Sequence, residues 1–295
     1  MKMKTVNTIY ASDLSDVGHS STDLFCTSLS SLLEDVQSPL IIKGLVKDWP
    51  MVKASEQSTQ SAVDYLKQFA SPMQVGIGEV PASENGRLFY NQDMSGFNFS
   101  RSNESFDTFI HHLINSADGA NNDSLHDNNS TNGYYMGSTH VDKLLPGFRQ
   151  TNDLDALAKK SALASIWISN QTRIAAHQDL PNNLACCVAG KRRFTLFPPH
   201  QIENLYIGPL DLTPAGQPIS LVDINNPDFD KHPKFKNALA HAQVAELEAG
   251  DALLLPTMWW HSVESLTSFN ILINYWWQDI PHYIGAPNDA LMHAL

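Results

Sequence analysis

The sequence has little of two features that mark particular classes of protein, cysteine and long apolar runs. Three cysteines among 295 residues are too few for a disulfide framework, and two of them, Cys186 and Cys187, are adjacent. No apolar run approaches the roughly 18 residues that a membrane-spanning helix needs. The first residues also lack the apolar segment of a signal peptide. The sequence therefore predicts a cytoplasmic protein that does not enter membranes.

Basic residues are also scarce. The chain has 19 Lys and Arg against 31 Asp and Glu, a formal net charge of -12. Such a chain repels phosphate backbones, so nucleic-acid binding is not expected. The hydrophobic content of 42% is ordinary for a protein with a folded core. Composition therefore predicts a globular protein whose partners are not nucleic acids.

The first part of the chain indicates helices around a short strand. Residues 22–36 place leucines at helical spacing, and residues 61–69 predict a second helix. Between them, residues 40–42 have the apolar character of a buried strand. We interpret residues 1–115 as an N-terminal extension of mixed helix and strand.

The stretch 116–133 is rich in Asn, Asp, Ser and Gly and has almost no apolar residues, which predicts a mobile surface loop. It could also be a linker between two domains. However, the chain before it never assembles enough strands for an independent core. We therefore expect one domain over residues 1–295, with its core at 134–280.

From residue 162 onward the pattern changes to short strands separated by Pro, Gly and Asn. No helices are expected between these strands, which is typical of an antiparallel sandwich or jelly roll. The fold class predicted is therefore mainly β. The last residues, PNDALMHAL, predict a short helix that could pair two subunits into a homodimer.

One short motif carries the chemistry. His177 and Asp179 are two positions apart, so on an extended strand both side chains leave the same face and can reach one cation. Such a pair alone is weak, because a structural histidine bonded to an aspartate is the commoner explanation. His261, which follows an apolar strand and two tryptophans, is the candidate third ligand. Two histidines and one carboxylate on one face of an octahedral ion leave open positions, which suits non-haem Fe(II).

These features occur in a longer pattern. The segments HQDLPNNLACCVAGKRRFTLFPPHQIENLYIGP, GDALLLPTMWWHSVESL and ILINYWW resemble the JmjC/cupin (cupin_8) oxygenases, and especially the branch with the asparaginyl hydroxylase that acts on hypoxia-inducible factor. The resemblance covers roughly residues 39–277. It implies a double-stranded β-helix, an Fe(II) cofactor, 2-oxoglutarate as co-substrate, and hydroxylation coupled to decarboxylation of the oxoacid.

The resemblance also implies residues that hold the distal carboxylate of 2-oxoglutarate. Arg192 stands where the family commonly has an inward-facing lysine, and a guanidinium can bind a carboxylate through two hydrogen bonds. Strand parity places Arg192 on the face opposite its neighbours, with Lys191 as the alternative. Tyr135 matches a family tyrosine that contacts the same carboxylate, and Tyr134 is the alternative in register.

Two asparagines complete the expected cofactor site. Asn183 and Asn274 match family positions around the oxoacid and the metal. Asn270 shares a strand face with Asn274, but a hydrogen bond to a neighbouring strand explains it equally well. The sequence departs from the family at Ile174, where a hydroxyl is common, although Thr172 lies two residues earlier.

The function expected is therefore an Fe(II)- and 2-oxoglutarate-dependent oxygenase acting on a protein side chain or a small molecule. Residues 89–91 and 94–99 are candidates for the mouth of the substrate site. Two alternatives remain: a cupin enzyme whose metal acts only as a Lewis acid, and a sensor or binding module without turnover. The sequence does not identify the substrate.

Overall fold

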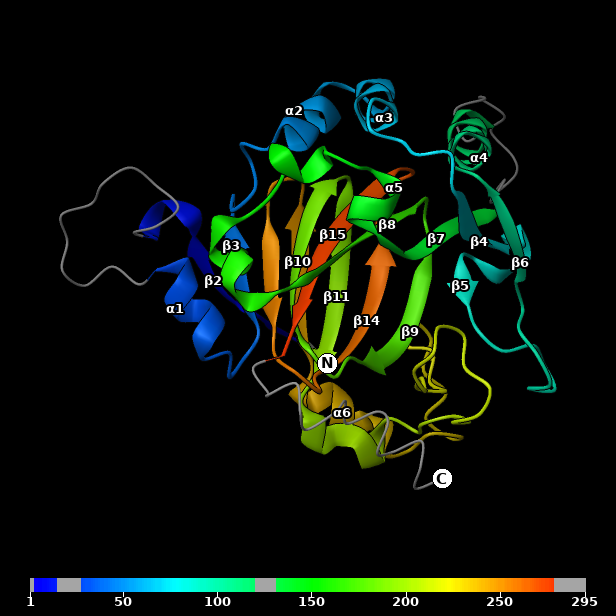
Figure 1. Ribbon diagram of the computed structural model, residues 1–295. Helices are drawn as coiled ribbons and strands as arrows, with labels where there is room; N and C mark the ends of the chain where they lie inside the picture. Colours follow the sequence, from blue (N-terminus) through cyan, green and yellow to red (C-terminus); the bar gives the residue numbers. More distant parts are fainter. Residues whose placement is uncertain (1–2, 15–27, 120–130, 279–295) are drawn as a thin grey trace.

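The protein is mainly β, with strands arranged in two sheets (Figure 1). The computed structural model describes residues 3–14, 28–119 and 131–278. Eight consecutive strands form the central part of both sheets: β8 (Leu163–Ser169), β9 (Arg173–Gln178), β10 (Asn182–Ala189), β11 (Lys191–Phe197), β12 (Gln243–Glu248), β13 (Ala252–Leu255), β14 (Trp260–Ser265) and β15 (Asn270–Trp277).

These eight strands are divided equally between the sheets. The order β12-β11-β14-β9 lies in a six-stranded sheet, and β13-β10-β15-β8 lies in a nine-stranded sheet. All pairings within each group are antiparallel. Because the chain passes repeatedly from one sheet to the other, this is the jelly-roll arrangement predicted from the sequence.

Strands from the first half of the chain extend both sheets. In the six-stranded sheet, β1 (Lys4–Thr5) pairs with β12 and β5 (Arg87–Leu88) pairs with β9. In the nine-stranded sheet, β2 (Asn7–Tyr10) and β3 (Leu40–Lys43) lie beyond β13. On its other side, β7 (Gly133–His140), β4 (Gln74–Val80) and β6 (Ser100–Ser105) follow β8. The strand expected at residues 40–42 is therefore β3.

The helices differ from the sequence-based expectation in several places. α3 (Thr59–Lys67) lies close to the helix expected at 61–69, and α1 (Leu29–Glu34) is the described part of the one expected at 22–36. α2 (Pro50–Gln57) was not predicted, although its first residue is a proline, whose fixed φ suits that position. α4 (Phe106–Gly119) continues into the stretch expected to be a loop.

Another expectation was wrong. The 3-10 turn at Pro199–Asn204 and α6 (Phe235–His241) lie between β11 and β12, where no helix was expected. The apolar side of α6 is short, with Phe235 and Ala238 buried, so its periodicity is too brief to detect. The helix expected at the C-terminus lies outside the described residues. α5 (Val141–Leu144) is a single turn after β7.

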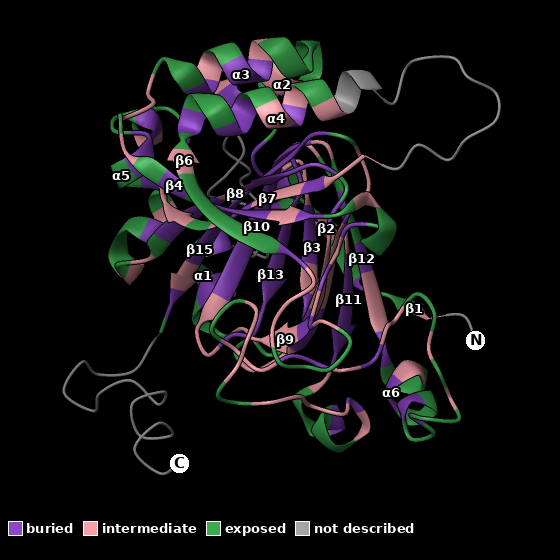
Figure 2. Ribbon diagram, turned by 90° about the vertical axis from the view of Figure 1, so that its right-hand side faces the viewer, coloured by how far each residue is buried: buried purple, intermediate pink, exposed green. Residues whose placement is uncertain are grey.

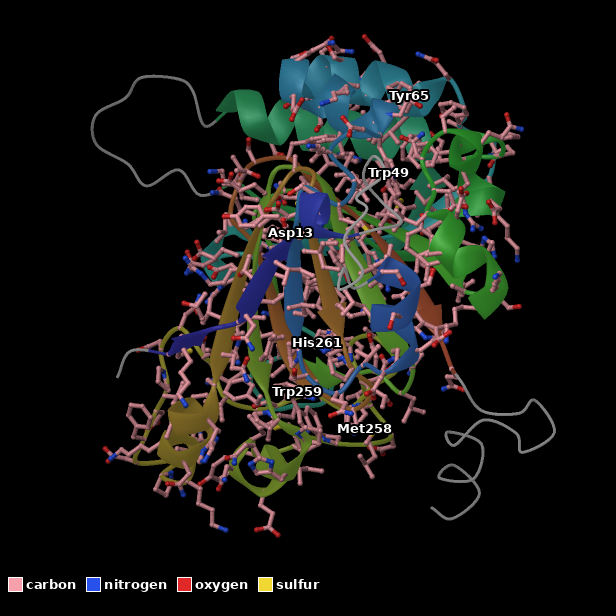
Figure 3. All side chains as sticks on the ribbon, turned by 90° about the vertical axis from the view of Figure 1, so that its left-hand side faces the viewer. Asp13, Trp49, Tyr65, Met258, Trp259 and His261 are labelled. Atoms are coloured by element: carbon pink, nitrogen blue, oxygen red, sulfur yellow. The ribbon has the colours of Figure 1, made fainter. Side chains whose placement is uncertain are left out.

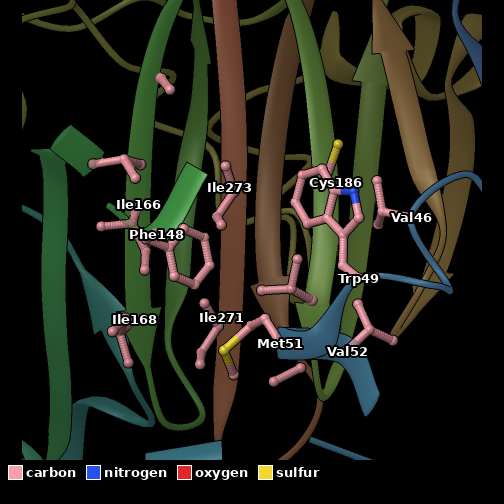
Figure 4. Close-up of a cluster of buried hydrophobic side chains, with 14 of the residues drawn as sticks. Val46, Trp49, Met51, Val52, Phe148, Ile166, Ile168, Cys186, Ile271 and Ile273 are labelled. Atoms are coloured by element: carbon pink, nitrogen blue, oxygen red, sulfur yellow. The ribbon is translucent and has the colours of Figure 1, made fainter. Parts of the chain in front are cut away.

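A large apolar cluster, here called the outer core, covers the outer face of the nine-stranded sheet. Figure 4 shows Trp49 beside Cys186 of β10 and Met51 beside Ile271 of β15, all of which are buried. In Figure 2 the helices α2, α3 and α4 lie together over one end of the sheet, whose strands are mostly buried, whereas β6 is exposed. Burial of this apolar surface is the main source of stability.

A smaller cluster, the barrel interior, lies between the sheets. Its members come from both: Ala185 and Cys187 of β10 and Leu272 of β15 meet Phe194 and Leu196 of β11. The thiol of Cys187 is buried, which raises its pKa to about 12, so it packs as a small apolar group, as predicted. Among the described helices, none is long and apolar enough to cross a membrane.

Candidate metal centre

The three candidate metal ligands lie together at one end of the barrel. His177 of β9 is paired in register with His261 of β14, and Asp179 follows directly after β9. The ring centroids of the histidines are 4.3 Å apart, and His261 Nε2 lies 3.7 Å from Asp179 Oδ2. One possible ligand atom from each residue lies within 4.8 Å of the others, which is compatible with a single ion between them.

Both histidines are oriented by backbone carbonyl groups. Nδ1 of His177 lies 2.9 Å from the carbonyl oxygen of Ala175, and Nδ1 of His261 lies 3.1 Å from that of Trp259. Each Nδ1 therefore carries the proton and donates it, which leaves both Nε2 atoms as lone-pair donors. Fixing the tautomer through such a hydrogen bond is characteristic of metal-binding histidines.

Burial favours the metal-binding form of His261. The side chain is buried, and this burial, together with the neighbouring His177, lowers the pKa of His261 to about 4. A neutral imidazole at neutral pH is the form that coordinates metal. Asp179 is buried as well, at 7% exposure, so a cation there would offset the cost of burying its charge.

A loop holds His261 beside Asp179. Met258, between β13 and β14, has the positive φ of 64°, which is unusual for a residue other than glycine. Its N–H donates to the carbonyl oxygen of Asp179 at 2.9 Å, and the N–H of Thr257 donates to Asn182 Oδ1 at 3.0 Å. Figure 3 shows Met258 and Trp259 near one end of the barrel, close to His261. Sequence reasoning missed this tether because backbone hydrogen bonds leave no motif.

Arg192 points into the barrel. It is 3% exposed, and its Nε and Nη2 have no hydrogen-bond partner in the described part of the chain. Burial lowers the pKa of its guanidinium, against the smaller opposing effects of Cys187 and Tyr135. A buried, unpaired charge is costly, so this arrangement favours an anionic ligand that supplies the missing acceptors.

The alternative to Arg192 lies outside the barrel. Lys191 is exposed and forms an ion pair with Glu248 at 2.5 Å. Arg193, also on the outer face, contacts Glu246 at 2.8 Å and Glu264 at 3.2 Å. The strand parity expected from the sequence is therefore present, and Lys191 is directed away from the candidate site.

The two candidate tyrosines are likewise on opposite faces. Burial raises the pKa of Tyr135, and its side chain lines the same cavity as His177. Tyr134 instead donates to Glu79 at 3.1 Å on the other side of the sheet. Tyr135 is thus the residue that the structure brings to the metal ligands.

Asn183 and Asn274 both face the barrel interior, on the paired strands β10 and β15. Asn183 Oδ1 is buried without a hydrogen-bond partner among the described residues. Asn274 Oδ1 accepts a hydrogen bond of 2.6 Å from Trp167 Nε1. Asn270, by contrast, is bonded to the backbone of Lys191 at 3.2 Å and takes part in a turn.

The hydroxyl expected near the first ligand is replaced by other groups. Ile174 packs beside Tyr135 in the cavity that His177 also lines, and Thr172 is buried. Two serines that sequence reasoning missed lie next to Arg192: Ser265 is its partner in register, and the Ser265 and Ser169 hydroxyls are 3.0 Å apart. They come from distant strands, so only the fold reveals them.

Gln217 is a further residue that the sequence did not indicate. Its Nε2 donates to Asp179 Oδ1 at 3.5 Å, and it lines the cavity against His177. It lies in the long connection between β11 and β12, which has no motif. Another part of this connection is fixed by Tyr90, whose hydroxyl donates to the carbonyl oxygen of Leu212 at 2.6 Å.

Known proteins that are similar to this chain were found by family and by sequence. The family of cupin-like domains matches residues 30–283. A lysine-specific demethylase, JMJ31 of Arabidopsis thaliana, is 31% identical over 41% of this chain and 22% of its own length. The tRNA wybutosine-synthesizing protein 5 of Gallus gallus is 26% identical over 83% of this chain and 72% of its own. JmjC domain-containing protein D of Dictyostelium discoideum is 28% identical over 79% of this chain and 50% of its own.

Proposed function

This chain belongs to the cupin-like domain family of the JmjC type, and we propose from this premise that it is an Fe(II)- and 2-oxoglutarate-dependent oxygenase. The substrate proposed is a protein side chain or a small molecule, which becomes hydroxylated. The observation that carries the proposal is Arg192, a buried guanidinium on the same interior face as His261 that has no acidic partner among the described residues.

The residues present fit both the metal and the co-substrate. His177, Asp179 and His261 would hold Fe(II) through two imidazole nitrogens and one carboxylate, the donor set that suits this ion. Arg192 and Tyr135 would hold the distal carboxylate of 2-oxoglutarate. With both bound, the centre supplies oxidative decarboxylation of the oxoacid coupled to hydroxylation of a C–H bond.

The contribution of the chain is orientation and exclusion of water. Backbone carbonyls fix the rings of both histidines, and the Met258 N–H fixes the turn at Asp179. Asn183 Oδ1, buried without a partner, is available to accept a hydrogen bond from a ligand or a water molecule. No side chain of the site is required as a general acid or base.

Arg192 also separates this proposal from its rivals. A cupin that uses its metal only as a Lewis acid has no need for a buried cation at the far end of the barrel. A binding module without turnover has no need for two histidines with oriented Nε2 atoms beside a buried carboxylate. The two features together favour a metal centre that works with an anionic co-substrate.

The test is an anaerobic titration of the Fe(II)-loaded protein with 2-oxoglutarate, followed by the visible charge-transfer band of a chelated ferrous complex. We expect the band in the wild-type protein and its loss in His177→Ala. Arg192→Gln should require a much higher concentration of 2-oxoglutarate. Lys191→Gln removes an equal charge from the outer face and should leave the titration unchanged.

Release of succinate under air provides a second measurement. Slow turnover of 2-oxoglutarate without added substrate is expected in the wild-type protein and should be absent in His177→Ala. A metal-loaded protein that shows neither the band nor succinate would contradict the oxygenase proposal. It would favour the Lewis-acid or sensor alternatives.

A further inference from the structure

A groove of about 640 Å³ lies over neighbouring strands of the nine-stranded sheet. Its walls include residues of β4, β6, β7 and β8. Tyr135, Leu88, Pro214 and Ala215 line this groove and also the cavity that His177 lines. The groove therefore adjoins the cavity beside the candidate metal centre.

The floor of the groove contains glycines, so no side chains project from the strands at these positions. Gly76 and Gly78 are on the same face of β4, and Gly137 is on β7. Glycine in a strand weakens it and often marks a place where another molecule approaches the backbone. A Cβ at Gly78 would lie 3.4 Å from Leu88 and 3.5 Å from Phe99, so a larger side chain there would fill the groove.

Arg101 provides the charge of this groove. It is paired in register with Gly78, which in turn is paired with Tyr135. The three residues thus form one row across the sheet, and two strand spacings give about 10 Å between the first and the last. The Arg101 guanidinium lies 4.7 Å from the ring centroid of Phe97 and donates to the carbonyl oxygen of Pro214. This contact leaves further donors available.

No carboxylate in the described part of the chain pairs with Arg101. Apart from Arg101 and the buried Arg192, the arginines all form ion pairs with Asp or Glu: Arg87, Arg149, Arg173 and Arg193. The two arginines without such a pair are therefore the one inside the barrel and the one in the groove that leads to it.

The acidic residues of the same strands lie on the opposite face. Glu79 of β4 accepts a hydrogen bond from Tyr134, and a carboxylate oxygen of Glu104 of β6 lies 3.1 Å from Nε2 of His112 on α4. Among the described residues, no Asp or Glu lines the groove itself. In a chain with a net charge of -12, this separation leaves the groove locally positive.

We propose that the groove binds a substrate carrying a carboxylate, which Arg101 holds while another part of the same substrate lies at the metal centre. This inference rests on the proposed oxygenase function and specifies the substrate class. The substrate must be long enough to cover the row from Arg101 to Tyr135. A single guanidinium, rather than a basic stripe, favours a carboxylate over a nucleic-acid backbone, and a groove without acids disfavours cationic substrates.

The test measures binding by calorimetry with probes that differ in charge. The probes are acetyl-Ala-Ala-Glu-Ala-Ala-amide, its Gln and Lys counterparts, and decanoate, which distinguishes a peptide from a free carboxylic acid. We expect at least one of the two acids to bind at least about ten-fold more tightly than the Gln peptide, and the Lys peptide to bind most weakly. Equal affinities for acidic and neutral probes, or no acid binding at millimolar concentration, would overturn the proposal.

Variants assign any preference to Arg101. Arg101→Gln should abolish the preference for the acid, and Arg101→Lys, which keeps the positive charge, should restore most of it. A purely structural role of the contact with Pro214 would instead weaken the acidic and the Gln probes alike and leave the preference unchanged. Lys191→Gln removes the same charge outside the groove and should retain the preference. Gly78→Val should weaken all groove ligands without a change of charge. A preference that persists in Arg101→Gln would contradict the assignment.

The failure of this inference can be distinguished from that of the oxygenase proposal. The binding measurements use the protein without added metal, so they do not depend on Fe(II) chemistry. The 2-oxoglutarate titration is repeated with Arg101→Gln and should match that of the wild type. If the titration fails but the acid preference is present, the groove assignment stands alone. If the titration succeeds without an acid preference, only the groove assignment is wrong.

Discussion

The two faces of the nine-stranded sheet carry different kinds of residue, although they belong to the same strands. On β15, Ile271 and Ile273 point into the outer core, where apolar neighbours from the helices surround them. Leu272 and Asn274 point into the barrel interior. The outer face is packed almost entirely with apolar side chains, although Tyr275 Oη and Trp277 Nε1 have no hydrogen-bond partner among the described residues. The inner face carries amide side chains as well, and Asn183 Oδ1 has no partner there among the described residues.

β11 shows the same difference for charge. Lys191 and Arg193, on the outside, pair with glutamates of neighbouring strands, and such exposed pairs contribute little to stability. Arg192, between them, is buried, and no acidic partner for it lies in the part of the chain that the structure describes. Alternation of side chains along a strand thus lets one sequence support the fold on one face and leave a site for ligands on the other.

The largest effect on stability is expected in the outer core. Ile273→Ala removes a buried side chain and should lower the free energy of unfolding by about 2–5 kcal/mol. Urea unfolding followed by circular dichroism measures this change. The control is Ile202→Ala, because Ile202 is 47% exposed and its truncation should change the stability very little. Similar losses for both variants would contradict the assignment of Ile273 to the outer core.

The next largest effect is expected for metal binding at the inner end of the barrel. Asp179→Ala removes the only carboxylate of the candidate centre and should weaken Fe(II) binding by about 100-fold or more, roughly 2.7 kcal/mol. Metal content after dialysis, compared over a range of Fe(II) concentrations, measures the affinity. Gln178→Ala alters the adjacent residue on β9 and should bind metal as the wild type does.

The sequence predicts much of this difference between the inward-facing and outward-facing residues. Parity placed Arg192 and Lys191 on opposite faces, because the alternation of side chains in a strand is a local property. The resemblance to a family favoured Arg192 as the inward residue and left Lys191 as the alternative. The register of His177 opposite His261 could not be predicted, since it depends on pairing between strands that are far apart in sequence. The resemblance to a family supplied that link.

Other parts of the site could not have been found in this way. The Ser169 and Ser265 hydroxyls meet across strands that are 96 residues apart, and Gln217 reaches Asp179 from a connection without regular structure. The positive φ of Met258 is imposed by the hydrogen bonds of its loop, and the residue type gives no sign of it. These features arise from tertiary contacts, which override local preference.

A smaller effect on stability is expected from removing the buried charge of Arg192. Arg192→Met replaces a buried guanidinium by an apolar side chain and should raise the free energy of unfolding of the ligand-free protein by about 1–3 kcal/mol. Lys191→Met, on the outer face, should change it very little. Urea unfolding measures both variants. A loss of stability in Arg192→Met would indicate that the guanidinium is satisfied by the protein itself.

The same comparison predicts that 2-oxoglutarate stabilises only a protein that retains the inner charge. A ligand that binds the folded state raises the melting temperature, so 2-oxoglutarate with Fe(II) should raise that of the wild type and of Lys191→Met. It should have little effect on Arg192→Met. An equal increase in all three proteins would place the oxoacid elsewhere.

The smallest effect distinguishes two asparagines on the same face of one strand. Asn270 and Asn274 are equally buried, at 0% and 1% exposure, but Asn270 accepts from Thr267 Oγ1 at 2.8 Å and donates to the Thr267 carbonyl oxygen at 2.5 Å. Asn270→Ala should therefore lower the free energy of unfolding by about 1–2 kcal/mol and leave 2-oxoglutarate binding unchanged. Asn274→Ala should mainly weaken that binding, as measured by the anaerobic titration. If the two variants exchanged these effects, the structural role would belong to Asn274 and the binding role to Asn270.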